Sequence, residues 1–189
     1  MSIQYLKINQ LRESMKLPFE YAILGALMKR PMHGYDIHKF LSFPLGAVWY
    51  VGMSNMYAML KKLEADGHVW PTVEAHGNRP PKRVFAITEK GRGFFTEWLS
   101  KPVNNIRDMR VEFMAKLYFF KELRLSGGDE LVERQKAACQ RILDSIDPSN
   151  AEGSELARLL FDFRIRQIRS ILSWLEECLG FLKRSEDNG

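Results

Sequence analysis

The sequence predicts a mostly α-helical protein with one small β-hairpin. Three observations lead to this fold class. Residues 17–66 contain three short amphipathic segments separated by turn signals. Two short runs rich in β-branched and aromatic residues follow, and they flank a basic loop. From residue 103 onward, apolar residues recur at helical spacing in three long segments.

The first 42 residues predict an N-terminal arm and two helices. Residues 1–16 space their apolar side chains as an amphipathic arm or helix would. Residues 17–29 predict a helix, with Pro18 suited to its first turn and Arg30-Pro31 ending it. A turn at His33-Gly34 then leads into a second short helix over residues 35–41.

The third predicted helix covers residues 54–66. Ser54 is a good candidate for the N-cap, and Gly67 fits the left-handed residue that often follows a helix. Helical spacing places one group of apolar residues on a single face: Met56, Met59, Leu60 and Leu63. The opposite face is polar, so this helix is expected to pack by one side only.

A hairpin and a fourth helix follow. Residues 68–73 and 83–88 predict two short strands, and residues 74–82 between them predict a basic, turn-rich loop. The fourth helix is expected over residues 88–99. Three helices followed by a hairpin with a basic tip is the order of a winged helix-turn-helix. We expect this domain to occupy residues 17–102.

The second half, residues 103–189, predicts an all-helical domain with helices over 107–124, 130–146 and 154–183. The last helix has more apolar positions than one face of a monomer needs. We therefore expect the domain to form a homodimer, because stable dimer interfaces are large and apolar. The residues predicted for this interface are Phe113, Leu117, Phe120, Leu160, Phe163, Ile168, Ile171, Leu175, Leu179 and Leu182.

Composition excludes several classes of protein. Hydrophobic residues make up 46% of the 189 residues, which is too many for a disordered chain. The sequence has no apolar run of the ~20 residues that span a bilayer and no signal peptide, so we expect a cytoplasmic protein. Cys139 and Cys178 lack metal-ligand spacing and fit small core or interface residues, with a redox switch as the minority interpretation.

The positive charge is confined to the first half of the chain. Residues 1–100 contain 13 Lys+Arg and 8 Asp+Glu, whereas the remaining residues contain 15 of each. The whole net charge of +5 therefore belongs to the half with the predicted winged helix. This asymmetry favours a polyanion as the partner of that half.

A winged helix binds DNA by placing one helix in the major groove, which is wide enough to admit it. Polar residues on the third helix and cations beside the hairpin predict this contact: Ser54, Asn55, Tyr57, Lys61, Lys62, Arg79, Lys82 and Arg83. Each feature alone is also typical of a solvated surface, and Tyr57 could pack against the core. The alternative function is a dimeric protein-interaction module that no longer binds DNA.

Four blocks of the first half resemble the PadR family of transcriptional regulators. They are Leu24-Gly25-Ala26-Leu27, Pro31 to Ile37, Ser54 to Gly67, and Lys82 to Gly91. Arg110-Val111-Glu112-Phe113 resembles the subfamily with a longer helical second domain. The resemblance implies a homodimer on a pseudo-palindromic operator, often acting as a repressor. Asn55-Met56 departs from the Gln-plus-aliphatic pair expected there, which affects base preference and not the fold.

No enzymatic site is predicted. The sequence contains no G-x-S-x-G, P-loop or dinucleotide-binding glycine pattern, and we expect no cofactor. His33, Asp36 and His38 lack the spacing of a helical zinc pair and fit a polar surface better. The resemblance implies a possible small aromatic effector. The four tryptophans and the aromatics near residue 118 could line its pocket, although aromatics more often fill cores.

Overall fold

The computed structural model describes residues 19–42, 46, 52–76, 79–147 and 154–186. The predicted arm over residues 1–16 lies outside them. The chain divides into two compact units: one comprises Met1–Leu99 with Arg110–Phe119, and the other comprises Ser100–Met109 with Phe120–Gly189. That residues 17–102 fold as one domain stays a prediction.

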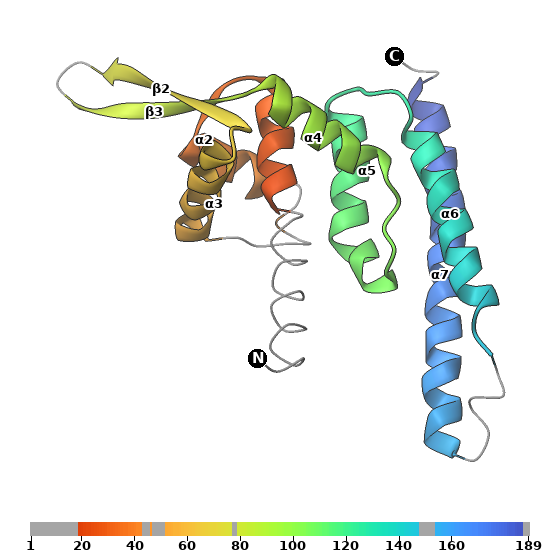
Figure 1. The fold of residues 1–189 in the computed structure, drawn as a ribbon. Helices are drawn as coiled ribbons and strands as arrows, with labels where there is room; N and C mark the ends of the chain where they lie inside the picture. Colours follow the sequence, from red (N-terminus) through yellow and green to blue (C-terminus); the bar gives the residue numbers. More distant parts are fainter. Residues whose placement is uncertain (1–18, 43–45, 47–51, 77–78, 148–153, 187–189) are drawn as a thin grey trace. The chain divides into compact units, whose positions relative to one another are not determined.

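Four helices of the first unit follow the predicted order (Figure 1). They are a helix over residues 19–29, α2 (Gly34–Ser42), α3 (Met53–Ala65) and α4 (Glu89–Ser100). Ser54 is not the N-cap of α3, because the helix begins one residue earlier and Gly52 caps it without a side-chain hydrogen bond. Gly67 does end the helix as predicted, with a φ of +73° that favours glycine.

The sheet is larger than the predicted hairpin. Strands β2 (Val69–His76) and β3 (Arg79–Ile87) pair in antiparallel fashion, and the short strand β1 (Met32–His33) pairs with the other side of β3. Residues 74–82 are therefore not the loop that was predicted. Pairing continues to His76 opposite Arg79, and the prolines of β3 lie where the register shifts. Proline lacks a ladder donor, so such an irregularity tolerates it.

The core of the first unit is aliphatic and aromatic. The helix over residues 19–29 buries residues 19, 20 and 22–27, and α3 buries Met56, Leu60 and Leu63. Phe95 from α4 meets Phe119 edge to face at 5.5 Å between ring centroids. This packing fixes the inner side of α3 and leaves its other side to solvent.

Helices α6 (Gly128–Asp144) and α7 (Glu155–Glu186) pack against each other in the second unit (Figure 1). Lys136 of α6 forms an ion pair with Glu176 of α7 at 2.6 Å. The buried side chain of Gln135 bonds both the backbone N–H and the carbonyl of Val103, at 2.7 and 3.1 Å. A buried amide that is paired on both sides fixes this segment to α6.

The single helix predicted over residues 107–124 is divided. A 3-10 helix (Ile106–Arg110) precedes α5 (Glu112–Glu122). Asn105 explains the tight first turn, because its carbonyl accepts from the Asp108 N–H and its side chain donates to the Asp108 carboxylate, both at 3.0 Å. Among the described residues, no helix has both the length and the apolar character needed to cross a membrane.

Candidate nucleic-acid interface

The predicted groove helix α3 turns a polar face to solvent. Ser54, Asn55, Tyr57, Lys61 and Lys62 are all exposed. The two faces follow from the spacing of its apolar residues, which recur every three or four positions and bury themselves in the core. The exposed face can therefore approach a large partner without disturbing the core. That these side chains contact DNA stays a prediction.

Tyr57 is held at the crossing of α2 and α3. A Cβ atom added at Gly34 would lie 2.7 Å from Cε1 of the Tyr57 ring, so only glycine allows this approach. Tyr57 nevertheless remains 49% exposed. The ring thus packs on α2 and is half exposed, and a contact of Tyr57 with DNA stays a prediction.

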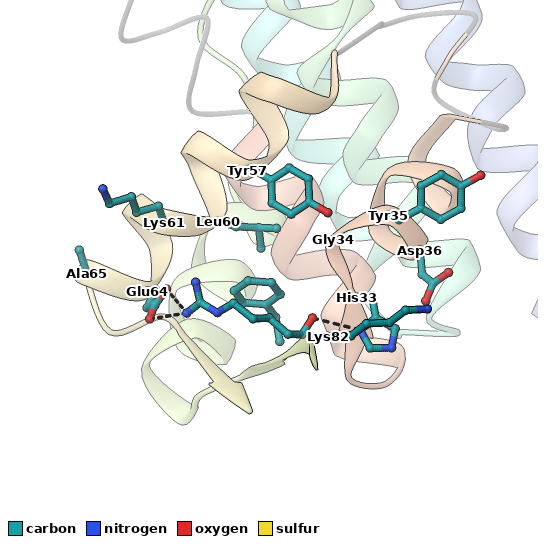
Figure 2. Close-up of a pocket in the computed structure, with 12 residues that line it drawn as sticks. His33, Gly34, Tyr35, Asp36, Tyr57, Leu60, Lys61, Glu64, Ala65 and Lys82 are labelled. Atoms are coloured by element: carbon teal, nitrogen blue, oxygen red, sulfur yellow. Dashed lines mark hydrogen bonds and ion pairs between the residues drawn. The ribbon is translucent and has the colours of Figure 1, made fainter. Parts of the chain in front are cut away.

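A hollow of about 900 Å³ lies between the start of α2, α3 and β3 (Figure 2). Its floor includes the buried residues Leu60 and Phe85, and its rim is polar. Sequence reasoning placed neither Tyr35 nor Asp36 in the interface, yet both line this hollow from α2. The full lining is His33, Gly34, Tyr35, Asp36, Tyr57, Leu60, Lys61, Glu64, Ala65, Lys82, Arg83 and Phe85.

Arg83 is engaged within the protein. Its Nη2 atom donates to both carboxylate oxygens of Glu64 at 2.8 Å each, which joins β3 to α3 (Figure 2). Its backbone carbonyl accepts from Nδ1 of His33 at 3.0 Å. The predicted phosphate contact of Arg83 therefore competes with an existing ion pair. No signal in the sequence links Glu64 to Arg83, because they come from different elements 19 positions apart.

Lys62 also has an internal partner. Its Nζ atom lies 2.8 Å from Oε1 of Glu20, a carboxylate that is almost completely buried. A buried carboxylate without a cation would be costly, so Lys62 offsets the negative charge of Glu20 in the helix over residues 19–29. The sequence assigned Lys62 to phosphate. The structure shows that Lys62 joins α3 to that helix, and its contact with phosphate stays a prediction.

Lys61 and Lys82 differ from the other two cations. Both are exposed and both line the hollow, from α3 and β3 respectively. Neither forms an ion pair with any residue that the structure describes. Arg79 lies in β3, where its backbone pairs with His76, and its side chain lies outside the described part. Lys61 and Lys82 are therefore the cations best placed for an anionic partner.

Several of the aromatic residues considered for an effector pocket pack against one another, whereas Trp70 is 67% exposed. Trp98 stacks on Tyr21 with centroids 4.6 Å apart, and its Nε1 donates to Glu112 at 2.8 Å. Glu112 also pairs with the buried Lys116 at 3.0 Å. Burial, with a smaller contribution from Glu112, raises the pKa of Tyr21 to about 12. The side chains of this cluster fill its interior. Trp49 lies outside the described residues.

The predicted dimer surface separates into two groups. Phe113, Phe120, Ile168, Leu175 and Leu179 are buried within the single chain and leave no surface for a partner. Leu117, Ile171 and Leu182 are half-buried. Leu160 and Phe163 are more than 60% exposed, and they share this exposure with Leu156 and Leu159. The available surface is therefore on the first third of α7.

Comparison with known proteins covers both units. Residues 23–97 match the model of the transcriptional regulator PadR-like family, and residues 109–183 match the model called virulence activator alpha C-term. The negative transcriptional regulator PadR of Bacillus subtilis is 26% identical over 177 residues, which cover 87% of this chain and 97% of the relative. A probable transcriptional regulator of Mycobacterium tuberculosis is 26% identical over 182 residues, covering 86% and 95%.

A crystal structure of Bacillus subtilis PadR in complex with operator DNA is also similar. The two chains are 26% identical, the match covers 86% of this chain and 97% of the other, and the TM-score is 0.45.

Proposed function

The chain belongs to the PadR-like family of transcriptional regulators, which are DNA-binding proteins and not enzymes, and from this premise we propose that it is a repressor that binds a pseudo-palindromic operator as a homodimer. The related protein of Bacillus subtilis, matched over nearly its whole length, is named a negative regulator, which supports repression.

The observation that carries the proposal is the exposed face of α3 beside the hollow. Asn55 near the start of the helix is free to reach base edges, and Asn can form a bidentate pair with adenine. Lys61 and Lys82 stand on two different walls of the hollow with no internal ion pair among the described residues. Base reading by α3 and phosphate binding by these lysines are separate functions of one surface.

The dimer is supported by the exposed face of α7. Leu156, Leu159, Leu160 and Phe163 follow one another at the three- and four-residue spacing of a single helical stripe. Four large apolar side chains on one helix face indicate an interaction site. A second copy of the same stripe is the natural occupant, because a two-fold dimer matches the two-fold symmetry of a palindromic site.

A small aromatic effector stays a prediction. In the first unit the described aromatic cluster around Trp98 is filled by its own side chains. Such a compound would bind there only if the aromatic side chains moved apart, and otherwise it would need a different site in the proposed dimer. No ligand is proposed.

Selection of binding sites from random duplex DNA tests the proposed function. We expect the wild-type protein to enrich an inverted repeat whose half-sites lie about 10 base pairs apart, or a multiple of that distance. Asn55→Ala should change which sequences are enriched, because it removes a base contact. Lys61→Ala is the matched control and should weaken all sequences alike. Failure of the wild-type protein to enrich any sequence would favour the protein-interaction module.

A further inference from the structure

Arg83 is held from three directions by its own protein. Its guanidinium group lies over the Phe85 ring at 5.3 Å, and its Nη2 binds both oxygens of Glu64. Its carbonyl accepts from His33 of β1. A side chain fixed by stacking and by a charged hydrogen bond is already committed to one geometry. Arg83 is thus a fixed part of the lining of the hollow.

Glu64 is the unexpected member of this pair. It places a carboxylate on the surface that, under the proposed function, faces phosphates. An uncompensated carboxylate there would repel DNA. Glu64 lies in the last turn of α3, and Arg83 is the middle residue of β3, where it pairs with Val73 of β2. Their ion pair is a direct side-chain connection between the groove helix and the ribbon.

We propose that Glu64 and Arg83 form a positioning pair that sets the angle of the β2–β3 ribbon against α3, and that neither residue binds phosphate. The proposal rests on the proposed function. The pair keeps the walls of the hollow at a fixed separation, and Lys61 and Lys82 stand on those walls. Losing either partner therefore misplaces the two lysines relative to each other.

The negative charge of Glu64 allows a positioning role to be distinguished from a purely electrostatic effect on DNA binding. Removing a carboxylate from a DNA-facing surface should strengthen binding if charge alone matters, because repulsion decreases. The positioning pair predicts the opposite result, namely that Glu64→Gln weakens DNA binding. Both side chains are partly exposed, at 51% for Arg83 and 32% for Glu64, and exposed ion pairs contribute little to overall stability. The variants should therefore fold normally.

A double-mutant cycle on DNA binding tests the pair. The probe is the duplex selected by the wild-type protein, and the variants are Glu64→Gln, Arg83→Gln and the double variant. We expect each single change to weaken binding by roughly tenfold and the double change to weaken it no further, because residues in contact are not additive. The slope of log affinity against log salt should change by the same amount in all three variants, because each of them misplaces the same two lysines.

Two further variants complete the cycle. The charge-swapped Glu64→Arg/Arg83→Glu protein should recover much of the lost affinity, because it restores the pair with the opposite orientation. Glu89→Gln is the matched control, since it removes an exposed carboxylate of α4 in the same unit. Glu89→Gln should strengthen DNA binding slightly, because it decreases repulsion from the phosphates. If Glu64→Gln also strengthens binding, the proposal is wrong. It is also wrong if Arg83→Gln alone weakens binding and reduces the salt slope by about 0.9, the value for one phosphate contact.

Hydrogen exchange in the free protein separates this inference from the proposed function. Amides of β2 and β3 should exchange faster in Glu64→Gln and Arg83→Gln than in the wild type, while those of α6 should not change. Unchanged exchange in the ribbon would overturn the positioning role. A wild-type protein that binds no DNA at all would overturn the proposed function, and the exchange result would still decide whether the pair holds the ribbon.

Discussion

Helices α3 and α7 expose opposite kinds of surface. Both bury one apolar face within their own unit, but α3 presents Asn55, Lys61 and neighbouring polar residues, whereas α7 presents Leu160 and Phe163 among four exposed apolar side chains. A polar, basic face suits a charged and hydrated partner, and an apolar face suits a protein partner. The difference supports the proposal that the first unit binds DNA and the second self-associates.

The two faces of α7 explain why its interface was only partly predictable. Successive residues of an α-helix are about 100° apart, so the centre of the exposed stripe (Leu156, Leu159, Leu160 and Phe163) and the centre of the buried stripe (Ile168, Leu175 and Leu179) lie roughly 130° apart. The two stripes also lie on different segments of the helix, residues 156–163 and residues 168–179. The sequence shows a single continuous series of apolar residues, and only the position of α6 separates those packed inside the chain from those left outside.

The largest expected effect comes from placing charge on the exposed stripe. If the protein is the proposed dimer, Leu160→Lys/Phe163→Lys should convert it into a folded monomer, because two lysines cannot be buried at an apolar interface without partners. Light scattering gives the mass, and circular dichroism checks the fold. Ser173→Lys is the control, since it adds one lysine at an exposed position of α7 away from the stripe. A double variant that keeps the mass of the dimer would refute the assignment of this surface.

Leu175 should behave differently from the exposed stripe, although it belongs to the same helix. Its side chain is fully buried, so Leu175→Ala should lower the free energy of unfolding by about 2–5 kcal/mol. Ser173→Ala should change it by less than about 0.5 kcal/mol. Denaturant unfolding measures both. Equal effects would mean that α7 packs with a different face from the one observed.

The smallest effect concerns a buried histidine in the first unit. His68 stacks on Phe94 at 4.5 Å, its Nδ1 has no hydrogen-bond partner among the described residues, and burial lowers its pKa, with Lys90 acting in the same direction. The unfolded chain therefore takes up the proton first as pH falls. The stabilisation is present above about pH 6.5 and decreases below it, by at most about 1.4 kcal/mol per pH unit.

Replacing the histidine should flatten this dependence. The free energy of unfolding of His68→Phe, measured from pH 7.5 to 5, should fall less steeply than that of the wild type. If His68→Phe and the wild type show the same slope, protonation of His68 does not contribute to the pH dependence.

Much of the fold was predictable because it depends on local patterns. Apolar spacing located α2, α3 and α4, and Gly67 correctly marked the end of α3. Long-range pairing was not predictable. The strand β1 consists of only two residues and exists through its contact with β3, and the loop expected over residues 74–82 is mostly strand because β2 and β3 continue to pair there.

The candidate site divides in the same way. The exposed face of α3 follows from helical spacing alone, and the structure agrees with that expectation. The roles of the cations do not follow, because a positive charge in sequence carries no information about its partner. Lys62 and Arg83 meet Glu20 and Glu64, which come from other elements, whereas Lys61 and Lys82 meet no described carboxylate.

The salt dependence of binding to the selected duplex tests the central claim most directly, that the α3–β3 face binds DNA through Lys61 and Lys82. Each of Lys61→Ala and Lys82→Ala should reduce the magnitude of the log–log slope by about 0.9, and the double variant by about twice that amount. Arg169→Ala, which removes an exposed cation from α7, should leave the slope unchanged. A slope that stays at the wild-type value in the double lysine variant would contradict the account.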